Sequence, residues 1–209
     1  MKTVVQRVKE GKILVSDGAW GTQLYARGLC PGDCPESWCV ERFWDCVRIA
    51  KSYIEAGADM VKTNSFGGSR VKLALYGLHA RTEEFNEAAA RASRTAAGEG
   101  VHVLASVGPT GKFLFAGEIT PEELYTVFAQ QARALQKGGA DVILFETMSD
   151  LEEAAAGIRA ARENTRCEVA CTFTFEKNAR GKYHTLTGAT PAEAARAALK
   201  AGAHMIGAN

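Results

Sequence analysis

Six polar residues stand directly after short apolar runs, at positions where the strands of a parallel sheet would end. They are Asp17, Asn64, Ser106, Glu146, Thr174 and Asn209. In a parallel barrel the carboxyl ends of all strands meet at one mouth, where active sites form. Two carboxylates would then face one pocket. Because the set contains no histidine or cysteine, it suits the binding of a charged ligand better than the supply of a nucleophile.

A recurring pattern of helix, glycine turn and apolar strand positions these residues. It occurs in AGADMVKTN (56–64), GGADVILFET (138–147) and AGAHMIGAN (201–209). Glycine suits the left-handed position that closes a helix, and the apolar runs have the length of buried parallel strands. The remaining predicted strands are 12–17, 101–106 and 168–175, which brings the number to six. This alternation predicts a parallel α/β fold, either an open doubly wound sheet or a (β/α)8 barrel.

The starts of several helices are marked by capping boxes, in which a Ser or Thr precedes a Glu by three residues. The predicted boxes are Thr120 with Glu123, Thr190 with Glu193 and Ser149 with Glu152. A further helix is predicted over 41–57, where apolar residues recur at the spacing of one helical face. No G-x-G-x-x-G follows any predicted strand, so the dinucleotide site of an open sheet is not indicated.

Composition narrows the class of protein. The 209 residues suit one domain, and 25 basic against 24 acidic residues, with no basic block, favour neither a nucleic-acid surface nor a membrane surface. No apolar run reaches the length of a membrane span and no signal peptide is present, so we expect a cytoplasmic protein with reduced thiols. The spacing of the first four of the six cysteines matches no common zinc motif, so no metal ligand is assigned among them.

Several motifs together resemble one family. DGAWGTQL (17–24), TNSFGGSR (63–70), SVGPTGKF (106–113), FETMSDLEEA (145–154) and LTGATP (186–191) are similar, in order and spacing, to the homocysteine-binding domain of cobalamin-dependent methionine synthase and related homocysteine S-methyltransferases. The resemblance covers essentially all of residues 1–209. It implies a (β/α)8 TIM barrel, of which this chain would supply the first six βα units. It also implies methyl transfer to the thiol of homocysteine, which yields methionine.

The resemblance further implies roles for individual residues. Asp17 and Glu146 would hold the substrate ammonium, and the backbone amides of Gly18 and Ala19 would approach its carboxylate. The other residues expected in the wall are Asn64, Ser106, Gly108 and Asn209. The family activates the sulfur on zinc held by three cysteines, the first of which follows the position of Asn209, so we expect the zinc ligands beyond this chain and the chain alone to be inactive. The methyl donor could be methylcobalamin, methyltetrahydrofolate or a sulfonium, supplied by a corrinoid or folate domain or protein.

Two alternatives remain open from the residues alone. A different barrel enzyme, such as an aldolase-like lyase, would share the alternation and the polar mouth. Lys62 is the only lysine inside a predicted strand close to that mouth, so it would be the Schiff-base candidate. The second alternative is a non-catalytic, incomplete barrel that acts as a binding module, because six strands cannot close an eight-stranded barrel and would leave open edges.

Overall fold

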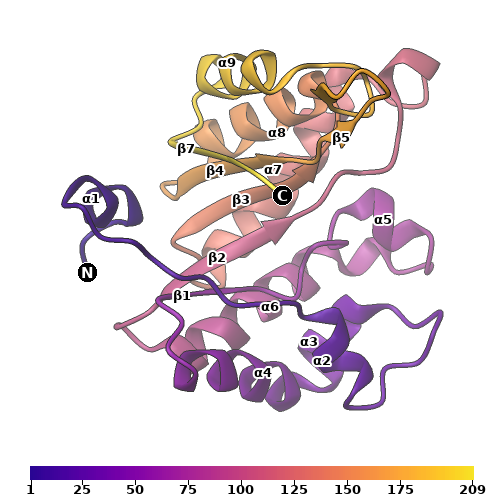
Figure 1. The fold of residues 1–209 in the computed structure, drawn as a ribbon. Coiled ribbons are helices and arrows are strands. Elements are labelled where there is room, and N and C mark those ends of the chain that lie inside the picture. Colours follow the sequence, from indigo (N-terminus) through magenta and orange to yellow (C-terminus); the bar gives the residue numbers. More distant parts are fainter.

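Five parallel strands form one twisted sheet in the order β1-β2-β3-β4-β7, in a computed structural model that describes residues 1–209 (Figure 1). The strands are β1 (Met60–Lys62), β2 (His102–Val107), β3 (Val142–Met148), β4 (Glu168–Phe173) and β7 (Met205–Ala208). Each pairs in parallel with its neighbour, and spatial order follows chain order. The carboxyl ends of the strands therefore lie together at one end of the sheet, as predicted for the polar residues that follow them.

A layer of helices covers one side of the sheet (Figure 1). These helices are α4 (Phe43–Glu55), α6 (Thr82–Ala97), α7 (Pro121–Lys137), α8 (Leu151–Asn164) and α9 (Pro191–Ala201). Successive helices in the layer contact one another. The short elements are α2 (Gly21–Tyr25), η1 (Pro35–Ser37), α3 (Trp38–Glu41), α5 (Arg70–Ala74), η2 (His79–Arg81), η3 (Leu114–Ala116), β5 (Glu176–Lys177) and β6 (Tyr183–His184). None of the helices combines the length and the apolar character needed to cross a bilayer.

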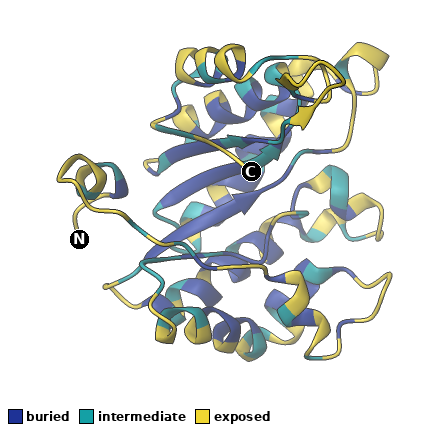
Figure 2. Ribbon diagram, in the orientation of Figure 1, coloured by how far each residue is buried: buried dark blue, intermediate teal, exposed yellow.

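Apolar side chains lie on both faces of the sheet, whose strands are largely buried (Figure 2). Val107, Ile143 and Phe145 pack against the helical layer in the largest cluster. Leu104 and Leu144 point to the opposite face and form a smaller cluster with Val4, Val142 and Ala170, which we call the inner cluster. Burial on both faces explains why the strands read as continuous apolar runs rather than as alternating ones.

The helix α1 (Val4–Lys9) lies apart from the layer, at the starts of the strands (Figure 1). Val4 is buried in the inner cluster, and the backbone N–H groups of Val4 and Val5 donate to the Glu168 carboxylate at 2.8 and 3.2 Å. A carboxylate at a helix N-terminus satisfies free amides and complements the helix dipole. This helix was not predicted from the sequence.

The prediction of a strand over 12–17 was wrong. This segment runs beside β1 but makes only an isolated bridge between Ser16 and Met60. Ile13 is 91% exposed and Val15 57% exposed, so one side of this apolar run has no covering layer. With one neighbouring strand and only one side covered, where Leu14 packs against the cluster that contains Val4, little stabilises a longer ladder. The parallel sheet thus contains five of the six predicted strands.

The helix starts were predicted with one error. Thr120 and Thr190 form complete capping boxes with Glu123 and Glu193. The third helix is capped by Asp150 rather than Ser149, because the Asp150 carboxylate accepts from the backbone N–H groups of both Glu152 and Glu153, at 2.8 and 3.0 Å. The hairpin of β5 and β6 was not predicted.

Candidate functional site

A polar cavity of about 310 Å³ lies at the carboxyl ends of β1, β2 and β3. It brings together three residues predicted from the sequence, Asn64, Ser106 and Glu146. The other polar or aromatic side chains in its wall are those of Trp20, Glu36, Lys62, Thr63, Ser65, Phe66 and Thr147. Its volume and its mixed charges suit a small zwitterionic ligand.

Glu146 is the best-defined charged group in the cavity. Its Oε1 accepts a short hydrogen bond from Ser106 Oγ, and its Oε2 lies 3.6 Å from Lys62 Nζ. Ser106 is itself fixed, because its N–H donates to Thr63 Oγ1 at 3.0 Å and its carbonyl oxygen accepts from Ser65 Oγ at 2.7 Å. One carboxylate oxygen of Glu146 is therefore held by the protein, while the other faces a loose ion pair.

Asp17 lies behind the cavity rather than in its wall. Its Oδ2 accepts from Trp20 Nε1 at 2.8 Å and from the Lys62 backbone N–H at 2.9 Å, and its Oδ1 accepts from Ser16 Oγ at 3.1 Å. Burial raises the pKa of this carboxyl, and the hydrogen bonds from Lys62 and Trp20 oppose that change. In this structure Asp17 thus orients two residues that line the cavity.

Gly18 and Ala19 follow Asp17 and are exposed outside the lining. Tyr53 holds this turn, because its hydroxyl donates to the Ala19 carbonyl oxygen at 2.7 Å. A Cβ added to Gly18 would lie 3.2 Å from the Tyr53 ring, so the glycine permits this close packing. The contact of their amides with a ligand stays a prediction.

Asn64 and Glu36 join two loops at the edge of the cavity. Asn64 Nδ2 donates to the Pro35 carbonyl oxygen at 2.7 Å, and the Gly67 N–H donates to Glu36 Oε1 at 2.7 Å. Glu36 is only 5% exposed, and burial raises its pKa. No sequence signal singled out Glu36, because its position depends on a loop from elsewhere in the chain.

Gly108 and Asn209 lie beside the cavity rather than in its wall. A Cβ on Gly108 would come within 2.6 Å of the Phe66 ring, so glycine makes room for that ring at the cavity. Asn209 Nδ2 donates to Thr147 Oγ1 and Thr174 Oγ1, both at 2.9 Å, while its Oδ1 accepts from Thr172 Oγ1. Thr147 follows Glu146 at an irregularity of the β3 ladder and has a φ of 66°.

The histidine, cysteine and acidic side chains of the chain are dispersed. No three His, Cys, Asp or Glu side chains are grouped so that they could hold an ion. Five of the six cysteines are buried, and burial raises the pKa of Cys34 and Cys167 to about 11 and that of Cys171 to about 12. The thiols of Cys34, Cys167 and Cys171 are therefore protonated at neutral pH.

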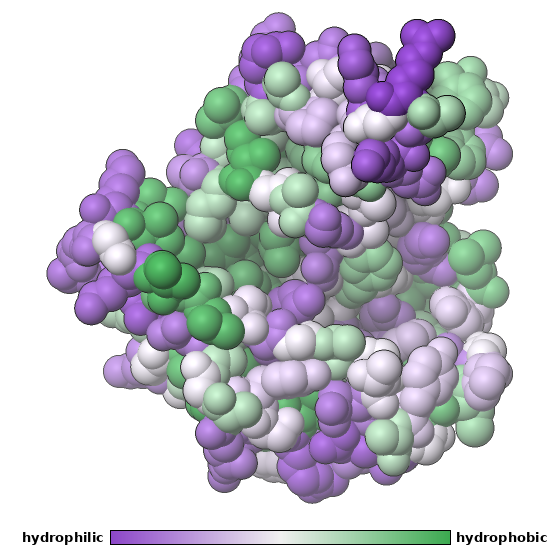
Figure 3. All heavy atoms as spheres, in the orientation of Figure 1, coloured by the Kyte–Doolittle hydropathy of each residue, from purple (hydrophilic) through white to green (hydrophobic).

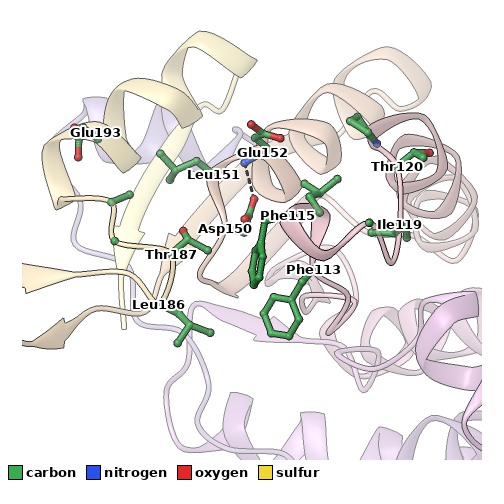
Figure 4. A pocket seen from close by; sticks show the side chains of 15 residues that line it. Phe113, Phe115, Ile119, Thr120, Asp150, Leu151, Glu152, Leu186, Thr187 and Glu193 are labelled. Carbon is green, nitrogen blue, oxygen red and sulfur yellow. Dashed lines mark hydrogen bonds between the residues drawn. The ribbon is translucent and has the colours of Figure 1, made fainter.

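Two other hollows differ from the polar cavity. The open face of the sheet is hollowed, with hydrophobic residues gathered beside α1 (Figure 3). An open groove of about 1310 Å³ lies between the loops that follow β2, β3 and β4, where Phe113, Phe115 and Leu186 approach Asp150 and Thr187 (Figure 4). Phe115 is 79% exposed there. The groove is lined by acidic residues without a basic one, whereas the cavity beside Glu146 contains both signs of charge.

The fold and the cavity define a parallel α/β domain with a polar cavity at the carboxyl ends of its strands. Residues 14–209 match the family model of homocysteine S-methyltransferases, and the chain belongs to this family. It is 32% identical over 163 residues to a methionine synthase of Mycobacterium tuberculosis, and 30% identical over 174 residues to that of Mycobacterium leprae. These stretches cover 72% and 78% of this chain but 14% of each relative's length.

Solved structures support the fold. The apo form of the homocysteine methyltransferase MmuM from Escherichia coli superposes with a TM-score of 0.75 at 21% identity, over 97% of this chain and 73% of that one. Its metallated form gives 0.71 at 19% identity, over 98% of this chain and 94% of that one. At such identities the likeness concerns the arrangement of the chain and not the residues of the site.

Proposed function

We propose that this chain binds homocysteine and is the part of a methyltransferase that presents the homocysteine thiol for methylation to methionine. The observation that carries the proposal is the pairing of Glu146 with Lys62 in a small cavity of a domain of this family. A free amino acid needs an anionic acceptor for its ammonium and donors for its carboxylate, and charge-assisted hydrogen bonds of this kind are the stronger ones.

In the proposed complex Glu146 accepts the substrate ammonium, and Asp17 contributes negative charge from behind. The backbone amides of Gly18 and Ala19 approach the carboxylate. Asn64 and Ser106 complete the wall, and Gly108 and Asn209 support it from beside the cavity. Support for this arrangement comes from the hydrogen bond of Ser106 to Glu146, which leaves Oε2 of Glu146 available to a ligand.

The thiol needs a separate activating group, because a thiol with a pKa near about 8.5 is mostly protonated at neutral pH. The family resemblance implies zinc bound by three cysteines, and residues 1–209 do not fit that ion, since they contain no group of three suitable side chains. We therefore propose that the zinc ligands lie outside these residues and that residues 1–209 alone bind homocysteine without methylating it. A methyl donor such as methylcobalamin or methyltetrahydrofolate would likewise be bound elsewhere.

Isothermal titration with homocysteine under reducing conditions tests the binding site. Glu146→Gln removes the charge that meets the ammonium, and we expect affinity to fall about thirtyfold or more. Asp17→Asn should weaken binding by a smaller factor, because Asp17 acts through its neighbours. Glu99→Gln, an exposed change outside the cavity, is the matched control. Unchanged affinity in both site variants would remove the site assignment.

A Schiff-base lyase is the second candidate, because Lys62 Nζ does lie in the cavity. Such an enzyme would trap a keto acid on Lys62 when borohydride is added, whereas the methyltransferase proposal expects no adduct. Mass spectrometry of the treated protein distinguishes the two. A purely structural binding module would instead need a partner to cover the open edges, and a well-behaved monomer in sedimentation would argue against that need.

A further inference from the structure

Lys62 is an unusual residue for its position. It ends β1 inside a buried sheet, and it is the one basic residue in the wall of the cavity. Its side chain is 23% exposed, and its ammonium makes a single ion pair, with Glu146 Oε2 at 3.6 Å. That separation is longer than a hydrogen bond, so the N–H groups of the ammonium keep their capacity to donate.

The backbone of Lys62 is fixed from both sides. Its N–H donates to Asp17 Oδ2 at 2.9 Å, and its carbonyl oxygen accepts from Ser93 Oγ at 2.8 Å. Asp17 and Ser93 belong to segments on opposite sides of β1 in the sequence. The root of the side chain is thus anchored while its end remains free, an arrangement suited to a group that contacts a ligand.

Glu146 is anchored in a complementary way. Ser106 holds Oε1, and the other oxygen, Oε2, faces the Lys62 ammonium. The cavity therefore presents one positive and one negative group side by side, neither fully satisfied by the protein. A zwitterion carries the same two charges at a similar separation, so it can lie antiparallel to this ion pair and meet each charge with its opposite.

We propose that Lys62 is a specificity residue that binds the carboxylate of the amino-acid substrate, while Glu146 binds its ammonium. This proposal rests on the proposed function and adds a charged partner to the amides of Gly18 and Ala19. Lys62 would make the site select an intact α-amino acid over an amine or an acid alone. A purely structural role, in which Lys62 only orients Glu146, makes a different prediction about ligands.

Two truncated ligands separate these roles. Aminopropanethiol is homocysteine without its carboxylate, and mercaptobutanoate is homocysteine without its ammonium. Titration of the 209-residue chain and of its Lys62→Met variant with homocysteine and both analogues measures the contribution of each charge. Lys62→Arg keeps the positive charge and is the conservative control, and thermal melting of every variant reports on folding.

We expect Lys62→Met to weaken homocysteine binding about tenfold or more and to weaken mercaptobutanoate binding as well. Binding of aminopropanethiol should stay the same or improve, because the variant removes a positive charge that repels the ligand ammonium. Lys62→Arg should retain most of the preference for homocysteine. Opposite changes for the two amine ligands cannot come from misfolding, which would weaken both.

An equal loss for homocysteine and aminopropanethiol, or no loss for either, would overturn the role of Lys62 while leaving the proposed function intact. A borohydride-trapped adduct on Lys62 would overturn it as well. Failure of the unaltered chain to bind homocysteine would instead overturn the proposed function, and the role of Lys62 with it.

Discussion

The carboxylates at the two ends of the sheet are held in opposite ways. At the strand starts, the Val15 N–H donates to Asp59 at 3.1 Å and Arg7 pairs with Asp59 at 3.1 Å, and these contacts lower its pKa. At the strand ends, burial raises the pKa of both Asp17 and Glu36. At the strand starts, neighbouring donors stabilise the charged form of Asp59. At the strand ends, burial makes the charged forms of Asp17 and Glu36 unfavourable.

This difference separates stability from recognition. At the strand starts, both carboxylate oxygens of Glu168 accept hydrogen bonds from backbone amides of α1. Glu146 at the strand ends has one oxygen bound to Ser106 and the other in a loose contact with Lys62. Groups with perturbed or incompletely satisfied charge gather at functional sites, because a ligand supplies the missing interactions. The same residue type thus serves the fold at one end and, in the proposed complex, the ligand at the other.

The largest effect on stability is expected from Glu168→Ala. The change removes the acceptor for two backbone amides of α1 and frees the helix whose Val4 fills the inner cluster. Hydrogen bonds to a charged group contribute about 1.5 to 3 kcal/mol, so the free energy of unfolding should fall by about 2 kcal/mol. Urea denaturation measures the loss, and homocysteine affinity should not change once the folded fraction is accounted for.

Glu10→Ala is the matched control for this change. Glu10 lies at the other end of α1 and pairs with Lys2 at 2.6 Å on an exposed surface. Exposed pairs contribute about 0 to 1 kcal/mol, so this variant should stay close to the unaltered chain. The contrast between the two ends fails if Glu168→Ala alters ligand affinity or leaves stability unchanged.

Glu36→Gln tests the contrast between the two ends of the sheet through the pH dependence of the free energy of unfolding. Because burial raises the native pKa of Glu36 above its ordinary 4.5, the native state binds this proton more tightly than the unfolded state. The free energy of unfolding of the unaltered chain therefore falls as pH rises from the unfolded pKa through the native one. Glutamine can keep the contact with Gly67 without this cost, so the variant should be about 1 kcal/mol more stable at neutral pH. The gap should close in acid.

Asp59→Asn should change the free energy of unfolding at neutral pH in the direction opposite to Glu36→Gln. The pKa of Asp59 is lowered, chiefly by the hydrogen bond from Val15, so its contribution to stability is present above 3.8 and is lost as pH falls through the native pKa. This variant should be less stable than the unaltered chain at neutral pH, and the two should converge in acid. Denaturation at a series of pH values compares both variants. Parallel pH profiles for the two would remove the electrostatic distinction between the ends.

Local signals in the sequence predicted most of the fold. The capping boxes at Thr120 and Thr190 depend on residues three apart, and both formed. The apolar runs that became β2, β3 and β4 are largely buried, whereas β1 and β7 at the two edges of the sheet are more exposed. The run over 12–17 looked alike but lacked a covering layer on one side, which a local pattern does not report. The competition between Ser149 and Asp150 for one cap was equally invisible, because both residue types cap helices.

Of the residues that line the cavity, only those at strand ends were predicted. Asn64, Ser106 and Glu146 line the cavity because parallel strands align their carboxyl ends. Trp20 and Glu36 reach it from loops whose paths depend on long-range contacts, such as that of Glu36 with Gly67. Lys62 could be singled out from the sequence because it is a charged residue inside an apolar strand. It was considered as a Schiff-base lysine, and its ion pair with Glu146 was not predicted.

The smallest change in stability is expected for substitutions of Thr147, which test whether backbone strain also distinguishes the strand ends from the strand starts. Thr147 is the only residue other than glycine with a positive φ, and it lies at the strand ends beside Glu146. A β-branched residue is unfavourable in this conformation, whereas asparagine tolerates it. Thr147→Asn should raise the free energy of unfolding by about 0.5 kcal/mol and weaken homocysteine binding slightly, since the contact with Asn209 is altered.

Thr147→Val keeps the strain and removes the hydroxyl, so it should lower both stability and affinity. If both variants destabilise the protein equally, the strain at Thr147 has no energetic weight, and the strand ends differ from the strand starts in charge alone.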